Sequence, residues 1–557
     1  MEDFKTVFLS SLAKVFPQGE PAVSTVKEFA VLKGEVFSFQ IAYWNRELIL
    51  TPVKLTVESP LAKEIHFKQV ENVPVSWMPP ILDEDIISDK VGIYPDILRE
   101  PAKKNVFESC HCQWRSIWGE ITPKRTCKAG KYPIKVTLSY TGKDPEGKEM
   151  EYCSSEEFTL EVMDAVLPPQ KLKNTHWFHS DCLMDYYKVE AFSSEYWRIV
   201  ENFMRSAVKN GQNMVLTPLF TPPLDTQIGG ERPTVQLVKV KKDKEGYHFD
   251  LTLLEKWIDT AKKAGIQYFE MSHLFTQWGA KATPKIMVED ENGNVKRAFG
   301  WDVKADSKKY KDFLGAFLPV LTAFLKEKKL VKKVYFHTSD EPSEAHLENY
   351  ASASSILKKH LKGFRLLDAL SEVEFYKKGL VEIPIPIVSK LDIFMEEKVP
   401  ERWTYYCCVP QKTHVNRFIY MPSSRNRVLG ALLYRYHVEG FLHWGFNFYN
   451  SVFSQYNIDP YCDTCSRDTF PAGDGFLVYP GKGGIPEESI RQKVFMEALQ
   501  DQRLCELLEE KVGRSAVEKV LDSFAPDGVM KMDSYPKGEE NIWKMRKALT
   551  DLLRKNP

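Results

Sequence analysis

Short apolar segments alternate with amphipathic helical segments through residues 171–486, and this alternation constrains the fold more than any other feature of the sequence. One helical segment is marked by Trp197, Val200, Met204 and Ala207, which share a face at helical spacing. The expected strands number eight and lie at residues 175–181, 213–219, 266–274, 331–342, 364–370, 385–392, 402–409 and 439–450. Eight strand-first units predict a (β/α)8 TIM-type barrel, in which functional sites lie at the carboxyl ends of the strands. An open doubly wound sheet is the alternative, but the Gly-rich phosphate-binding motif that would favour it is missing.

Residues 1–165 show the period of β-strands instead. Apolar and polar residues alternate in 132–140 and again in 156–162, after a Gly-containing turn, which predicts a hairpin with one buried face. The same alternation occurs at residues 37–43. Several such strands are expected to close into an antiparallel β-sandwich, which would serve as an accessory domain.

Two further boundaries follow from the pattern. Pro168 and Pro169 are poorly suited to a helix or a central strand, so they mark the end of the sandwich. Residues 487–557 carry apolar faces at helical spacing, and we expect a small helical tail packed on the barrel, which itself would span 171–486.

Composition excludes several classes of partner. The chain of 557 residues has 43% hydrophobic and 27% charged residues, with 76 basic and 76 acidic side chains. This balance gives no electrostatic reason to expect nucleic acid or an anionic membrane as a partner. No apolar run approaches the roughly 20 residues of a membrane span, and the first residues do not resemble a secretion signal. We therefore expect a cytoplasmic protein without membrane insertion, although a leader removed from the natural chain would leave export open.

The cysteines do not predict a metal site. The ten cysteines are scattered through the chain, which favours reduced thiols over a disulfide framework. Cys462 and Cys465 form a CxxC pair, and residues 110–112 read Cys-His-Cys, but neither group has a second ligand pair nearby. No metal and no cofactor are expected. The sequence carries no signal for the oligomeric state.

Adjacent carboxylates end the fourth expected strand. The segment 331–342 reads VKKVYFHTSDEP, so an apolar strand leads directly to Asp340 and Glu341 and is stopped by Pro342. Carboxyl groups fixed on a rigid element are what glycosidic bond cleavage requires. The alternative is structural, because acids followed by proline are also favoured at the first turn of a helix.

Other strand ends supply aromatic and polar side chains that suit a carbohydrate. Aromatic planes can stack on the apolar faces of a sugar, while polar groups bind its hydroxyls. Each of these residues could instead be structural, since large aromatic residues also fill barrel cores. The candidates are His179, His273, Trp278, Tyr406, Trp444 and Asn447.

Four motifs together give the sequence a specific resemblance. They are Ser339–Pro342 at a strand end, WGFNFYN at 444–450, GDGFLVYPG at 473–481, and Ser489–Arg491. With the order of sandwich, barrel and helical tail, they make the chain resemble glycoside hydrolase family 123, the β-N-acetylgalactosaminidases, over nearly its whole length. The resemblance implies a retaining, exo-acting hydrolase of terminal β-linked N-acetylgalactosamine (GalNAc) in glycans of glycosphingolipid type.

The mechanism implied by this resemblance agrees with the spacing of the two acids. Ordinary glycosidases hold two carboxyl groups about 5–5.5 Å or about 6.5–9.5 Å apart across the anomeric carbon. Adjacent residues in an extended chain point to opposite sides of the backbone and cannot easily do this. In a substrate-assisted route the 2-acetamido oxygen is the nucleophile, Glu341 is the acid and base, and Asp340 orients the acetamido group. An ionised Asp340 would also help to keep Glu341 protonated.

Further roles are expected for residues in the same motifs. Trp444 is a candidate stacking surface, Tyr406 a donor to the acetamido oxygen, and Asn447 a group that binds a hydroxyl. The turn-rich segment 473–481 is expected to cross the barrel mouth and place Asp474 or Tyr479 near the sugar, or else to be a rigid turn.

Two other functional classes remain open from the sequence. One is an ordinary two-carboxylate glycosidase acting on another sugar, with Glu270 or Asp181 completing the pair. The other is a carbohydrate-binding protein without turnover. Cleavage of substrates that lack the 2-acetamido group would favour the first, and binding without product release would favour the second.

Overall fold

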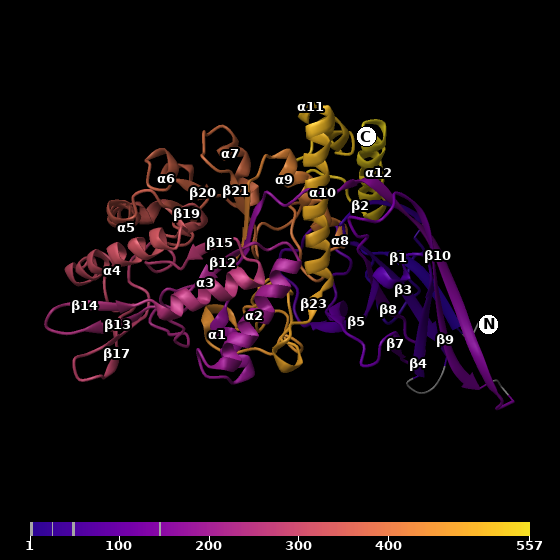
Figure 1. Ribbon diagram of the computed structural model, residues 1–557, viewed down its shortest axis with the longest axis horizontal. Helices are drawn as coiled ribbons and strands as arrows, with labels where there is room; N and C mark the ends of the chain where they lie inside the picture. Colours follow the sequence, from indigo (N-terminus) through magenta and orange to yellow (C-terminus); the bar gives the residue numbers. More distant parts are fainter. Residues whose placement is uncertain (1–3, 25, 47–50, 144–145) are drawn as a thin grey trace. The chain divides into compact units, whose positions relative to one another are not determined.

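The computed structural model describes residues 4–24, 26–46, 51–143 and 146–557 (Figure 1). The chain forms two compact units. The first contains residues 1–170, 411–436 and 487–557, and the second contains residues 171–410 and 437–486. These units divide the chain differently from the three domains expected from the sequence, because two later segments belong with the N-terminal part.

The first unit contains two β-sheets. The six-stranded sheet has the order β1 (Phe4–Ser10), β3 (Phe37–Asn45), β8 (Arg115–Ile121), β5 (Ile65–Val75), β6 (Gly92–Arg99) and β23 (Glu488–Ser489). The five-stranded sheet has the order β2 (Glu28–Lys33), β10 (Glu149–Val166), β9 (Gly130–Lys143), β4 (Thr51–Glu58) and β7 (Val106–Ser109).

Aromatic packing joins the two sheets into the predicted sandwich. Phe158 of β10 lies 4.7 Å from Phe8 of β1 and 4.8 Å from Phe39 of β3, measured between ring centroids. The hairpin of β9 and β10 is antiparallel, as expected. The sandwich is not antiparallel throughout, because β2 pairs with β10 in the parallel sense.

The C-terminal helices belong to this same unit. They are α10 (Ile490–Val512), α11 (Arg514–Asp522) and α12 (Glu539–Lys555), together with α8 (Ser423–Arg427) and α9 (Leu429–Arg435). Strand β23 pairs with β6, and Arg491 at the start of α10 forms a buried ion pair with Asp96 of β6 at 2.9 Å. Residues 487–557, expected as a tail on the barrel, are thus fixed to the sandwich by a strand pairing and by buried charge.

The second unit is the predicted barrel. Its strands follow the order β11 (Lys173–His176), β12 (Met214–Thr217), β15 (Tyr268–Met271), β18 (Val334–Phe336), β19 (Arg365–Ala369), β20 (Ile383–Ile385), β21 (Trp403–Tyr405) and β22 (Gly440–His443). All strand pairs are parallel, and β22 returns to β11. A parallel bridge between Ile387 and Tyr405 closes the circuit between β20 and β21. The sixth strand lies slightly before the expected segment 385–392, which is mostly helical turns.

Helices surround the barrel strands. They are α1 (Ser180–Tyr187), α2 (Ser194–Lys209), α3 (Thr252–Ala264), α4 (Lys308–Glu327), α5 (Leu347–His360), α6 (Val373–Lys377) and α7 (Leu391–Met395). Helix α2 begins after Ser193, whose side chain accepts from the backbone of Tyr196, and α3 ends at Gly265 in the left-handed conformation. No helix among the described residues combines the length and apolar composition needed to cross a bilayer.

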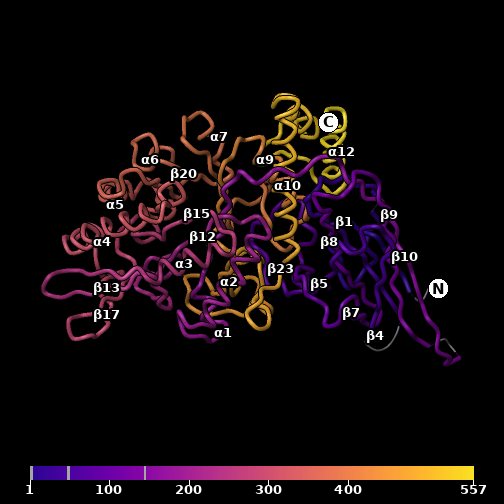
Figure 2. Tube along the Cα trace, in the orientation of Figure 1, coloured from indigo at the N-terminus to yellow at the C-terminus, as the bar shows by residue number. Residues whose placement is uncertain are grey.

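A small sheet in the barrel unit was not predicted. It consists of β14 (Tyr247–Asp250), β13 (Lys239–Lys242), β16 (Ile286–Glu289) and β17 (Val295–Phe299), and Figure 2 shows it extending away from the barrel strands. Its strands are short and mostly polar, so their hydrophobic periodicity is weak.

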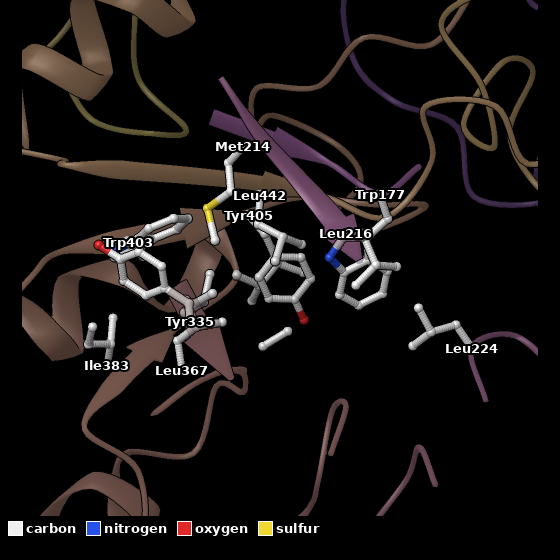
Figure 3. Close-up of a cluster of buried hydrophobic side chains, with 13 residues drawn as sticks. Trp177, Met214, Leu216, Leu224, Tyr335, Leu367, Ile383, Trp403, Tyr405 and Leu442 are labelled. Carbon is white, nitrogen blue, oxygen red and sulfur yellow. The ribbon is translucent and has the colours of Figure 1, made fainter. Parts of the chain in front are cut away.

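Large side chains fill the barrel interior (Figure 3). Tyr335, Trp403 and Met214 are fully buried there, and Trp177, Tyr405 and Leu442 belong to the same cluster. These last three also line a cavity, so the packed core forms the floor of the candidate site.

Candidate active site

A cavity of about 240 Å³ lies at the carboxyl ends of the barrel strands. Its lining comes from the segments that follow nearly every strand. The lining residues are Trp177, Leu224, Asp225, Gln277, Trp278, Asp340, Glu341, Ala369, Tyr405, Cys407, Cys408, Leu442, Trp444, Val452, Phe453 and Phe470. Three carboxyl groups therefore share one cavity with several aromatic rings.

The backbone at Glu341 explains how two adjacent acids reach the same cavity. Glu341 has φ 42°, in the left-handed region that non-glycine residues rarely adopt. This reversal breaks the extended alternation that would direct the side chains of Asp340 and Glu341 to opposite sides. Two backbone hydrogen bonds hold it, from the Glu341 N–H to the Ala369 carbonyl at 3.0 Å and from the Trp278 N–H to the Asp340 carbonyl at 2.8 Å.

The two carboxyl groups have different surroundings. Burial raises the pKa of Asp340 well above its usual range, and the negative charge of Glu341 raises it further. The hydroxyl of Tyr405 donates to Glu341 Oε1 at 2.5 Å. The spacing predicts an ionised Asp340 that helps to keep Glu341 protonated, whereas burial in the structure favours the neutral form of Asp340.

A buried network of charged side chains lies next to the segment that carries the acid pair. His337 on the β18 segment lies between Glu270 and Asp368, with Nε2 2.5 Å from Glu270 Oε1 and Nδ1 3.1 Å from Asp368 Oδ1. All three side chains are completely buried. Burial alone would lower the pKa of His337, but these hydrogen bonds raise it to about 9, so the ring is an imidazolium at neutral pH.

This network reaches the cavity at two points. Asp368 accepts hydrogen bonds from the backbone N–H groups of Thr338 and Ser339, immediately before the acid pair. Glu270 accepts from Trp177 Nε1 at 2.7 Å, and Trp177 lines the cavity. The network therefore fixes both the acid-bearing turn and one aromatic wall.

By distance alone, His273, His337 and Asp368 form the one group among the described residues that could hold a metal ion. Both nitrogens of His337 already donate to carboxylates, and a protonated imidazole has no lone pair for a metal. His273 stacks on His337 with centroids 4.2 Å apart, and burial with the charge of His337 lowers its pKa well below the usual value. The group is better described as an ion-pair network than as a metal centre.

Trp444 is held by a second set of buried contacts. Its Nε1 donates to Asp474 Oδ2 at 3.0 Å, and its carbonyl lies 2.9 Å from His179 Nε2. Burial, with the nearby Arg232 guanidinium, lowers the pKa of His179 to about 3, so the neutral ring donates from Nε2 and accepts from Arg232 at Nδ1. The amide of Asn447 bonds the backbone of His179 at 2.9 and 3.0 Å.

Of the residues proposed from the sequence, Asp340, Glu341, Trp278 and Trp444 line the cavity. His179, His273, Asn447, Asp474 and Tyr479 are buried and absent from the lining. Asp474, His179 and Asn447 support Trp444, while Tyr479 packs against Phe476 and Tyr461.

The assignment of Tyr406 requires correction. Tyr406 is fully buried against Phe441 and His443, and its neighbour Tyr405 lines the cavity instead. Successive strand residues point to opposite faces of the sheet, so an error of one residue in the expected register selects Tyr406 in place of Tyr405.

Several cavity residues were not singled out from the sequence. Asp225 lies in an irregular loop, where its side chain accepts from the Phe453 N–H at 3.0 Å, and burial raises its pKa to about 6. Trp177, Cys407 and Cys408 are the others of chemical interest. Trp177 directly follows a strand and could have been identified by that position; the loop that carries Asp225 has no such periodic signal.

Barrel fold, strand-end acids and aromatic walls together define the site of a carbohydrate-cleaving enzyme. The catalytic-domain model of glycoside hydrolase family 123 matches residues 177–508, which is more than half of the chain. The protein belongs to glycoside hydrolase family 123.

Solved structures also match the chain. A family 123 glycoside hydrolase from Clostridium perfringens, studied for glycolipid glycan hydrolysis, matches with a TM-score of 0.75 and 14% identity over 99% of each chain. A family 5 mannosidase from Rhizomucor miehei matches at a TM-score of 0.32 and 11% identity, over 62% of this chain and 95% of its own. No curated protein sequence matches the chain significantly.

Proposed function

We propose that the protein is a retaining, exo-acting β-N-acetylgalactosaminidase that works by substrate-assisted catalysis. The observation that carries this proposal is the left-handed turn at Glu341, which directs two adjacent carboxyl groups into one cavity. Adjacent acids are poorly placed to straddle a sugar ring, but they suit a reaction in which the substrate supplies its own nucleophile.

In the first step the 2-acetamido oxygen attacks the anomeric carbon as the glycosidic bond breaks. Glu341 gives its proton to the departing oxygen, and Asp340 accepts a hydrogen bond from the acetamido N–H. The product of this step is a bicyclic oxazolinium ion, whose positive charge Asp340 stabilises. Water then attacks the anomeric carbon, Glu341 takes its proton, and the configuration is retained.

The raised pKa of Asp340 fits this sequence of events. Burial favours the neutral form of Asp340. A bound acetamido N–H would donate to the ionised form and favour it, so substrate binding would leave the proton of the pair on Glu341. Tyr405, bonded to Glu341 Oε1, would fix the orientation of the acid.

The cavity suits one terminal sugar. Its volume of about 240 Å³ lies below the usual range of small-molecule pockets, about 300–1,000 Å³. Trp444 and Trp177 would stack on the sugar ring, and Asp225 offers a carboxylate to its hydroxyls. The Clostridium perfringens relative was studied for glycolipid glycan hydrolysis, and we propose the same class of glycan as the substrate.

The ordinary two-carboxylate alternative finds little support with the residues first considered for it. Glu270 is completely buried and bonded to His337, Trp177 and Thr175. Asp181 forms a buried bidentate ion pair with Arg232 at 2.8 Å. Neither lines the cavity, so neither can attack a bound sugar without rearrangement.

A panel of aryl β-glycosides that differ only at C2 and C4 tests the proposal. We expect the N-acetylgalactosaminide to be cleaved and the galactoside, which lacks the acetamido group, to be inert. The N-acetylglucosaminide, inverted only at C4, should be a poor substrate. Equal rates with the galactoside would contradict substrate assistance, and binding without release of the aryl group would favour a non-catalytic lectin.

A further inference from the structure

Two adjacent thiols line the wall of the catalytic cavity and are not used in the mechanism. Cys407 and Cys408 follow strand β21, both are partly exposed, and both line the cavity. They are thiols rather than half-cystines, and the Cys408 S–H donates to the sulfur of Cys407 at 3.9 Å. Their sulfur atoms therefore face each other across a short gap that opens to the cavity.

The pair lies beside the catalytic machinery. Tyr405, two residues earlier, donates to Glu341. The contact with Cys408 and burial raise the pKa of Cys407 well above its usual value, and the negative charge of Glu341 adds to the effect. Any group bound to the two sulfurs would occupy space next to the acid.

We propose that Cys407 and Cys408 form a dithiol site for trivalent arsenicals, and that occupation of this site closes the catalytic cavity. Soft, polarisable elements prefer sulfur ligands. Among the described residues, no carboxylate, histidine or further cysteine completes a group of three possible ligands with the two sulfurs. The site therefore suits an element that two sulfurs can hold, whereas a closed zinc site needs four ligands.

Geometry favours a bridging atom over a disulfide. A disulfide requires the sulfur atoms to approach to about 2.05 Å, and its Cα atoms usually lie about 4.4–6.8 Å apart. Adjacent residues have Cα atoms only about 3.8 Å apart across a trans peptide, so a bond between them is strained. An arsenic atom inserted between the sulfurs needs a much smaller change from the observed 3.9 Å.

The reaction with phenylarsine oxide is balanced without an oxidant. Two As–S bonds form, the bond from arsenic to oxygen breaks, and the oxygen leaves as one water with both thiol protons. Arsenic remains trivalent.

The experiment treats the full-length protein with phenylarsine oxide and reads two quantities. Peptide mapping should find one phenylarsenic adduct on the peptide that contains Cys407 and Cys408. Glycosidase activity should fall in parallel and return after addition of 2,3-dimercaptopropanol, but not with 2-mercaptoethanol at the same concentration. C407S and C408S should each need about a hundredfold more phenylarsine oxide for the same inhibition, because a single sulfur cannot chelate the arsenic.

C462S is the matched control, because Cys462 is an exposed thiol that also lies in a closely spaced pair, with Cys465, and is absent from the cavity lining. It should remain as sensitive as the unmodified protein. An adduct mapped to other cysteines, or undiminished sensitivity of both C407S and C408S, would overturn the proposal. The mapping needs no variant and no sugar substrate, so its result is independent of the proposed function.

Discussion

Replacing His337 should destabilise the barrel in a way that depends on pH. His337 is the only countercharge that contacts both Glu270 and Asp368 among the described residues, and all three side chains have 0% exposure. His337→Gln keeps a side chain of similar size but leaves the two carboxylates without their shared countercharge. Removing one partner of a buried ion pair typically costs about 3–5 kcal/mol.

The pKa of His337 gives an independent estimate. It rises from the ordinary 6.5 to about 9 in the folded protein. A rise of about 2.5 pH units, at about 1.36 kcal/mol per unit, corresponds to about 3 kcal/mol of stability. Because the folded pKa is the higher one, this contribution is complete below pH 6.5 and is lost as the pH rises through about 9.

Pulse proteolysis in urea can measure this in the barrel alone, if peptides from β15 and β18 are quantified by mass spectrometry. We expect H337Q to unfold at much lower urea than the unmodified protein at pH 6.5, and the difference to shrink above pH 9. His248→Gln is the control, since His248 pairs with Asp243 on the surface of the same unit, where such pairs contribute little. The reasoning would be refuted if H337Q and H248Q had the same urea midpoint of unfolding at pH 6.5 and if neither midpoint changed as the pH rose through 9.

Three further predictions concern the site. Glu341→Gln should abolish hydrolysis of glycosides with poor leaving groups and spare activated aryl glycosides, which need less protonation. Asp340→Asn should impair hydrolysis of both, because acetamido participation serves every substrate. Equal losses for the two variants across leaving groups would argue against this division. Trp444→Ala should raise KM, with about 1 kcal/mol lost for a stacking contact, and Trp444→Phe should recover part of it. Exhaustive chelation should leave the rate unchanged, and a loss restored by zinc would point to a metal site.

The barrel was predictable because its signals are periodic. The helical face at residues 197–207 lies on α2. Seven of the eight apolar segments overlap an observed strand by two residues or more, while the sixth shares only Ile385 with β20. The small sheet of β13, β14, β16 and β17 was missed because its short and mostly polar strands carry little hydrophobic pattern. The membership of residues 487–557 in the first unit depends on buried ion pairs such as Arg491 with Asp96, which join residues far apart in sequence and leave no local signal.

The site was predictable only in part for the same reason. Asp340, Glu341 and Trp444 belong to local motifs and line the cavity. The sequence pointed to Tyr406, but the cavity is lined by its neighbour Tyr405. Polarity alone does not fix the register of a strand to a single residue. Asp225 reaches the cavity from an irregular loop, and its position is set by a hydrogen bond to the distant Phe453 backbone.

Covalent trapping tests the central claim most directly. The protein would be incubated with a 2-deoxy-2-fluoro galactosyl donor and its intact mass measured, while a GalNAc-thiazoline, which resembles the bicyclic intermediate, is tested as an inhibitor in parallel. Our account predicts no glycosyl adduct and strong competitive inhibition by the thiazoline, because the substrate supplies the nucleophile. A glycosyl-enzyme on Asp340, Glu341 or Asp225, together with weak thiazoline binding, would contradict it.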